Sequence, residues 1–188
     1  MISISILFSG RGTNAESILK SIITKDLNFK VKKVICNNSH ADGIIKIENL
    51  GINVSIVEQK KYSNIKDFNK AIKNELNPKK GDLLLLCGYM KKIPNNIIKS
   101  YLGNVINIHP SLLPKYKGLN THERAIKNKD KYSGCTVHFV NSKLDSGKII
   151  NQKKVKICKF DNSKTLAKKI LIEEHKLYPA AIMKILSL

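Results

Sequence analysis

The chain has 188 residues, enough for one ordinary domain that buries its own core without a disulfide or a structural metal. Its 42% hydrophobic and 26% charged residues are close to globular averages, which excludes wholesale disorder and fibrous folds. No apolar run reaches the length of a membrane span, so no membrane partner is expected. The four cysteines are far apart without a C-x-x-C pair, which predicts no zinc site and a reducing, cytoplasmic location.

The net charge of +20 would ordinarily suggest a nucleic-acid partner. However, all basic residues except Arg11 and Arg124 are lysines, and they are spread over nearly every polar segment. Proteins that read DNA sequence usually need arginine forks and clustered contacts. We therefore expect a solvated basic surface without a specific nucleic-acid partner, which attracts phosphorylated substrates at low salt.

Predicted strands and helices alternate along the chain. In order they are strand Ile2–Phe8, helix Asn14–Thr24, strand Val31–Cys36, helix Ala41–Leu50, strand Val54–Val57, helix Ile65–Leu76, strand Leu83–Cys87, a helix beginning at Pro94, strand Val105–Ile108, a helix from Thr121, strands Cys135–Val140 and Lys148–Ile157, and helix Ser163–Leu186. This order predicts an α/β fold: a single Rossmann-like domain over residues 1–188, with a mostly parallel sheet and helices on both faces. Ligands of such sheets bind beyond the carboxyl ends of the strands.

The first strand is followed by Ser9-Gly10-Arg11-Gly12-Thr13-Asn14. Glycines allow a ligand to approach the backbone, and the following helix N-terminus offers free N–H groups, so the segment predicts a phosphate site. With Ala15 it also matches the dinucleotide fingerprint G-x-G-x-x-A, but the second strand ends in Cys36-Asn37-Asn38 without the acid that holds a ribose. NAD is therefore not expected, and a tight turn with a capped helix remains the structural alternative.

A second polar segment, from Asn107 to Gly118, follows a buried strand and contains His109. Alternation along the strand puts Asn107 and His109 on the same face. An amide donor and a titratable imidazole suit an attack on a carbonyl, because they can stabilise an oxyanion and move a proton. A structural histidine bonded to a backbone carbonyl is the alternative.

The loop Leu144-Asp145-Ser146-Gly147 is the third such segment. Asp145 could lie near His109 and raise its pKa, although an aspartate before glycine is also an ordinary turn residue. His138 alternates with Thr136 in a predicted strand, which leaves open a pocket or a sheet position.

These segments together resemble one family. They are the phosphate loop, Gly88-Tyr89-Met90, Asn107 to Gly118, Thr121-His122, Val137 to Val140, Leu144 to Gly147, and Glu174 to Pro179, in one order over almost the whole chain. The pattern resembles the phosphoribosylglycinamide formyltransferase family, the folate-dependent enzymes of purine synthesis. His-Pro-Ser-Leu-Leu-Pro is shared in part with tRNA formyltransferases and formyltetrahydrofolate deformylases, whereas Lys115-Tyr116-x-Gly118-Leu119 points to the glycinamide enzymes.

The resemblance implies transfer of a formyl group from 10-formyltetrahydrofolate to the amine of glycinamide ribonucleotide. The family triad corresponds to Asn107, His109 and Asp145, with the oxyanion stabilised by Asn107 and a protonated His109. Asp145 would raise the His109 pKa and assist proton transfer, without a metal ion. The matching positions place the remaining contacts: the substrate phosphate on Gly12, Thr13 and Asn14, its glycinamide side near Glu174, and the folate on Met90, Lys91, Lys92, Ile93 and Asn107, with the 141–145 loop.

Three other functions remain as alternatives. Another 10-formyltetrahydrofolate enzyme, formylating tRNA or hydrolysing the donor, is the nearest; the chain length favours the glycinamide enzyme, because the tRNA enzyme resembles this domain with a C-terminal addition. A nucleotide-binding oxidoreductase lacks the ribose carboxylate, and a basic nucleic-acid-binding module has only the net charge in its favour. The expected partners are small-molecule substrates, in a monomer or a weak homodimer.

Overall fold

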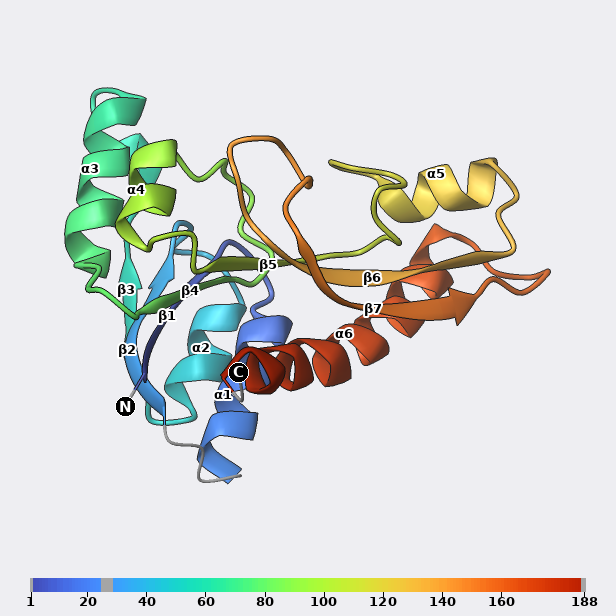
Figure 1. Ribbon diagram of the computed structural model, residues 1–188, viewed down its shortest axis with the longest axis horizontal. Coiled ribbons are helices and arrows are strands. Elements are labelled where there is room, and N and C mark those ends of the chain that lie inside the picture. The colour runs from blue at the N-terminus through green and yellow to red at the C-terminus, as the bar shows by residue number, and fades with distance from the viewer. Residues whose placement is uncertain (1, 25–28, 187–188) are drawn as a thin grey trace. The chain divides into compact units, whose positions relative to one another are not determined.

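The computed structural model describes residues 2–24 and 29–186 (Figure 1). The strands are β1 (Ile2–Phe8), β2 (Phe29–Cys36), β3 (Val54–Ile56), β4 (Leu83–Leu86), β5 (Val105–His109), β6 (Tyr132–Phe139) and β7 (Ile149–Lys156). The helices are α1 (Thr13–Thr24), α2 (Gly43–Glu48), α3 (Ile65–Leu76), α4 (Asn95–Ser100), α5 (Thr121–Lys127) and α6 (Ser163–Leu186), with a 3-10 turn η1 (Gln59–Lys61). Every predicted strand and helix is present, in the order β3-β2-β1-β4-β5-β6-β7 across the sheet, which confirms the α/β prediction.

The chain divides into two compact units, residues 1–106 and 107–188. In the first unit β1 pairs in parallel with β2 and with β4, and β2 pairs in parallel with β3. Because parallel crossovers are right-handed, the helices that connect strands outward from β1 to β3 lie on one face, and the helices that follow the reversal to β4 lie on the other. Accordingly, Figure 1 shows α1 and α2 on one side of these strands and α3 and α4 on the other.

The core of the first unit lies along its central strands. Ile4, Ile6 and Leu7 of β1 and Leu84 and Leu85 of β4 are almost fully buried. A strand covered by helices on both faces is apolar at consecutive positions, as the uninterrupted run of β4 predicts. The buried middle of these strands is therefore mostly apolar, with Ser5 of β1 as a polar exception, and the candidate ligand-binding residues lie in the loops that follow the strands.

The second unit is built on an antiparallel pair, β6 and β7, with α6 packed along both strands and α5 packed on β6 and α6. The strand β6 begins three residues before the predicted strand because it continues through Gly134. A Cβ at Gly134 would lie only 2.0 Å from the Lys153 carbonyl oxygen, so glycine permits the close pairing of these strands. None of the helices in the part of the chain that the structure describes is long and apolar enough to span a membrane.

A buried carboxylate, Glu58, organises the loop that follows β2. Its Oε1 accepts hydrogen bonds from the Ser39 backbone N–H at 3.0 Å and the Ser39 hydroxyl at 2.8 Å, and Lys60 Nζ lies 3.3 Å away. The hydrogen bonds from Ser39 favour the ionised form and lower the pKa of Glu58 to about 2. Glu58 thus ties the segment after β3 to the loop after β2.

Replacement of Glu58 by glutamine is expected to remove part of the chain's pH-dependent stability. The folded-state pKa is about 2 and the unfolded reference is 4.5, so the contribution is complete above 4.5 and is lost as the pH falls towards 2. Urea unfolding at a series of pH values should show a shallower acid loss for Glu58→Gln than for the native chain. Glu48→Gln, at an exposed position of α2, is the matched control, and an equal effect of both substitutions would contradict the role of Glu58.

Candidate active site

The second unit brings together three polar side chains from different segments. Asn107 and His109 share a face at the carboxyl end of β5, and Asp145 lies in the loop between β6 and β7. His109 Nδ1 lies 3.4 Å from Asp145 Oδ2, and both side chains are buried. The proximity expected between Asp145 and His109 is therefore present in the structure.

Both ring nitrogens of His109 face acceptors. Nε2 lies 2.8 Å from the Tyr116 carbonyl oxygen, which can only accept, so Nε2 donates this hydrogen bond. Nδ1 faces the Asp145 carboxylate. Only the protonated imidazole carries an N–H on both nitrogens, and this pair of acceptors is complementary to that form. The hydrogen bond to a backbone carbonyl that the structural alternative for His109 predicts is thus also present.

Asp145 is held by more than its turn. Its Oδ2 accepts a hydrogen bond of 2.8 Å from the Gly118 backbone N–H, which joins the two loops that carry the site. Asp145 itself has a left-handed backbone with φ 43°, and it precedes Gly147 by two residues. A Cβ at Gly147 would lie 1.7 Å from the Phe139 carbonyl oxygen, so only glycine lets the chain turn back so closely after Asp145.

The loop after His109 is anchored to β6. Thr136 Oγ1 donates to the Ser111 carbonyl at 2.6 Å and accepts from the Leu113 N–H at 3.1 Å. Ser111 Oγ donates to the Lys115 carbonyl at 2.6 Å. These bonds fix the segment that presents the Tyr116 carbonyl to His109.

A fourth side chain, His138 of β6, completes this cluster. Only 2% of it is exposed, and its Nε2 lies 3.3 Å from Asn107 Nδ2 and 3.7 Å from Asp145 Oδ1. Burial lowers the pKa of His138 and outweighs the opposing effects of the Phe139 carbonyl and Asp145. In the sequence, the alternation of Thr136 and His138 was the only indication of this position. It does not distinguish a histidine that lines a pocket from a histidine with a structural role in the sheet.

His122 of α5 is also close enough for its titration to feel His109. Burial, reinforced by the charge of His109, lowers the pKa of His122. Among the described residues, no hydrogen bond or ion pair joins His122 to Asn107, His109 or Asp145.

In the first unit, the predicted phosphate loop is a turn into α1. Gly12 has φ +65°, and its carbonyl accepts the Glu16 N–H at 2.8 Å, which opens the helix. Gly43, at the start of α2, donates its N–H to the Gly10 carbonyl at 3.2 Å. A Cβ at Gly43 would lie 2.7 Å from the Gly10 oxygen and from Gly12 Cα, so the backbones of the loop and α2 are in direct contact.

The predicted folate segment adjoins this loop within the same unit. The Met90 backbone N–H donates to Ser9 Oγ at 2.8 Å. Met90 is 71% exposed and Lys91 and Lys92 are exposed, whereas Ile93 is buried. The segment is thus held by the hydrogen bond of Met90 at one end and by the buried Ile93 at the other. The exposed Met90 side chain is available to a planar ligand.

Glu174 belongs to the second unit and is buried on α6. It lies near β6, where burial and the charge of Glu174 together raise the pKa of the Cys135 thiol to about 12. Among the described residues, no three His, Cys, Asp or Glu side chains are grouped as a metal ion would require.

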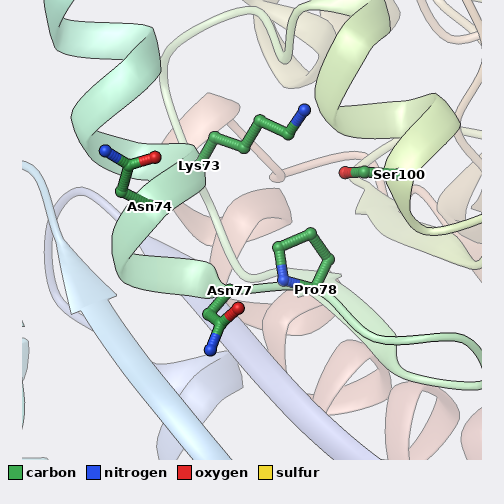
Figure 2. A pocket seen from close by; sticks show the side chains of 5 residues that line it. All are labelled: Lys73, Asn74, Asn77, Pro78 and Ser100. Atoms are coloured by element: carbon green, nitrogen blue, oxygen red, sulfur yellow. The ribbon is translucent and has the colours of Figure 1, made fainter.

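A pocket of about 510 Å³ lies elsewhere in the first unit (Figure 2). Lys73, Asn74, Asn77, Pro78 and Ser100 line it. It lies at the carboxyl-terminal ends of α3 and α4, where helix carbonyls disfavour an anion, and it includes none of the predicted site residues. It therefore does not match the phosphate site predicted from the sequence.

Comparison with known proteins identifies the family of this chain, and the α/β sheet with Asn107 and His109 at a strand end facing Asp145 agrees with it. The chain matches the formyl transferase family over residues 2–182 and belongs to that family. Its relatives include the phosphoribosylglycinamide formyltransferase of Haemophilus influenzae, 37% identical over 182 residues, which cover 97% of this chain and 86% of that protein. It is also 34% identical to the human trifunctional purine biosynthetic protein adenosine-3, over 98% of this chain and 18% of that protein.

Solved structures give the same relationship. The glycinamide ribonucleotide transformylase 1 of Symbiobacterium toebii superposes with a TM-score of 0.92 at 35% identity, covering 97% of this chain and 86% of that one. The predicted family and fold are therefore confirmed, while the roles of individual residues remain predictions.

Proposed function

We propose that this chain transfers the formyl group of 10-formyltetrahydrofolate to the amine of glycinamide ribonucleotide in purine synthesis. The observation that carries the proposal is the cluster of Asn107, His109 and Asp145 in a member of the formyl transferase family. Relatives named for this activity match nearly the whole chain. Folate is a co-substrate here, and the reaction as proposed uses no metal ion.

The reaction begins when the substrate amine attacks the formyl carbon. A carbon–nitrogen bond forms and negative charge develops on the formyl oxygen, where N–H donors from Asn107 and His109 stabilise it. Because His109 Nε2 donates to the Tyr116 carbonyl in the structure, the formyl oxygen must replace or share that acceptor. The bond to the folate nitrogen then breaks, and the proton lost by the amine passes to that nitrogen.

Asp145 supports this step in two ways. Its carboxylate, 3.4 Å from His109 Nδ1, attracts positive charge on the ring and orients it. Its position beside the reacting groups also suits it to relay the proton from the amine, through water, to the leaving nitrogen. Its bond to the Gly118 N–H holds the carboxylate in place during both tasks.

The proposal assigns each substrate to the segments that match the family. The ribonucleotide phosphate binds Gly12, Thr13 and Asn14, where the start of α1 supplies free N–H groups and a favourable dipole. Glu174 takes the glycinamide side. The folate binds Met90, Lys91, Lys92 and Ile93 with Asn107, and the lysine-rich surface steers both anionic substrates at low salt.

The whole chain, residues 1–188, is proposed to act as one cytoplasmic formyltransferase domain, as a monomer or weak homodimer. The proposed function involves no specific nucleic-acid partner and no membrane. A formyl-transfer assay at moderate salt, with 10-formyltetrahydrofolate as donor, compares glycinamide ribonucleotide, methionyl-tRNA and water as acceptors. Turnover with the ribonucleotide alone supports the proposal, whereas transfer to tRNA, release of formate, or silence of the folded protein contradicts it.

Replacement of Gly43 by alanine is expected to weaken ribonucleotide binding without entering the chemistry. The added methyl group overlaps Gly10 and Gly12, so the phosphate loop must shift, at a cost of about 1–3 kcal/mol for overpacking. Steady-state kinetics should show KM for the ribonucleotide raised about tenfold, as about 1.4 kcal/mol of lost binding predicts, with kcat little changed. Ile45→Ala, at an exposed site on the same helix, should leave KM unchanged; an unaltered KM in Gly43→Ala would show that this contact does not shape the loop.

A further inference from the structure

His138 makes hydrogen bonds that the proposed reaction does not use directly. Its Nδ1 lies 2.8 Å from the Phe139 carbonyl oxygen, and its Nε2 lies 3.3 Å from Asn107 Nδ2. The side chain is almost completely buried on β6. It therefore contacts one of the two proposed oxyanion donors.

The first of these contacts decides which ring nitrogen carries the hydrogen. A backbone carbonyl only accepts, so Nδ1 of His138 is the N–H donor. Burial lowers the pKa of His138, so the ring is neutral near pH 7 and Nε2 presents a lone pair. The partner of that lone pair must be a donor. The nearer neighbour of Nε2, Asn107 Nδ2 at 3.3 Å, is one, whereas the Asp145 carboxylate oxygen lies further away, at 3.7 Å.

The second contact then decides how the Asn107 amide is oriented. Its NH2 group can donate one hydrogen to Nε2 of His138, whereas its carbonyl oxygen in that place would oppose lone pair to lone pair. The other hydrogen of Nδ2 remains available for a substrate. A reversed amide would offer an oxygen to an oxyanion, which repels it.

We propose that His138 is a positioning residue that locks the side-chain amide of Asn107 with its NH2 group towards the reacting formyl oxygen. This inference rests on the proposed function for its catalytic consequence, but the hydrogen-bond pattern is independent of turnover. His138 itself does not touch the reacting atoms in this proposal. Its effect is exerted through Asn107, because the proposed function assigns no substrate contact to His138 itself.

The kinetic test compares two substitutions. His138→Leu removes the acceptor while keeping an apolar side chain in the buried site. It is expected to lower kcat about tenfold to a hundredfold, the scale of a misplaced group, with the KM for the ribonucleotide little changed. His138→Gln offers a carbonyl oxygen as a substitute acceptor and should restore most of that loss. In an Asn107→Ala background, His138→Leu should have almost no further effect, because the two residues act as one unit.

A spectroscopic measurement tests the same proposal without turnover. Nitrogen NMR of histidine-labelled native protein at neutral pH should show His138 as the neutral form protonated on Nδ1. A form protonated on Nε2, or a charged ring, overturns the proposal even if His138→Leu fails to fold. A folded His138→Leu with native kcat, or an equal further loss in Asn107→Ala, also overturns it. Native protein that shows the Nδ1 form but no formyl transfer contradicts the proposed function and leaves the positioning contact intact.

Discussion

Replacement of His109 by alanine is expected to lower kcat about a hundredfold to a thousandfold, the usual cost of losing one oxyanion donor in a preorganised site. The imidazole is buried, with Asp145 and the Tyr116 carbonyl on its two nitrogens, so the substitution removes an N–H donor that is held in a fixed position. The measurement is steady-state formyl transfer at saturating substrates, with urea unfolding to establish that the variant is folded.

His40→Ala is the matched control for His109. His40 is exposed in the first unit, and removing its imidazole should leave kcat unchanged. If folded His109→Ala kept kcat within about threefold of the native value, well short of the loss expected for an oxyanion donor, His109 would have no part in the mechanism.

Replacement of Asp145 by alanine is expected to lower kcat about a hundredfold or more, within the range of losses seen when a proton-transfer group is removed. Two effects combine, because the substitution removes the carboxylate facing His109 and also leaves the Gly118 N–H without its acceptor. Kinetics alone on this variant would not separate the charge from the loop anchor.

Asp145→Asn separates them. The amide oxygen of asparagine can still accept the Gly118 N–H, so the loop is held while the negative charge is lost. We expect Asp145→Asn to remain nearly as impaired in kcat as Asp145→Ala, with stability closer to native in urea unfolding. Native-like turnover in Asp145→Asn would mean that the carboxylate serves only to hold the loop.

The fold could be predicted from the sequence wherever burial produces a strong pattern of apolar residues. The continuous apolar run of β4 and the glycine-punctuated turn into α1 define the first unit, and both are where the sequence predicts them. The boundaries that differ have local causes. The strand β6 starts at Tyr132 because Gly134 allows a close strand contact that strand propensity disfavours. The helix α2 covers Gly43–Glu48, and its flanking residues Asp42 and Asn49 have helical backbone angles without extending it.

The candidate site could be predicted only in part from the sequence. Spacing put Asn107 and His109 on one face and left open whether Asp145 lies near His109 or is an ordinary turn residue. The resemblance to a family was needed to group the three as a triad. The contact of His138 with Asn107 could not be predicted, because it depends on which face of β6 turns inward. The Tyr116 carbonyl at His109 Nε2 and the backbone contact between Gly12 and Gly43 depend equally on tertiary packing, which leaves no pattern along the sequence.

The most direct test of the account follows the formyl carbon itself. The native protein is given 10-formyltetrahydrofolate labelled in the formyl carbon and glycinamide ribonucleotide labelled in the amine nitrogen, and products are observed by NMR. Direct transfer predicts that the carbon signal acquires coupling to the labelled nitrogen as the donor signal disappears, without free formate. Accumulation of labelled formate, or a donor signal that stays unchanged in the presence of folded protein, would contradict direct formyl transfer by this chain.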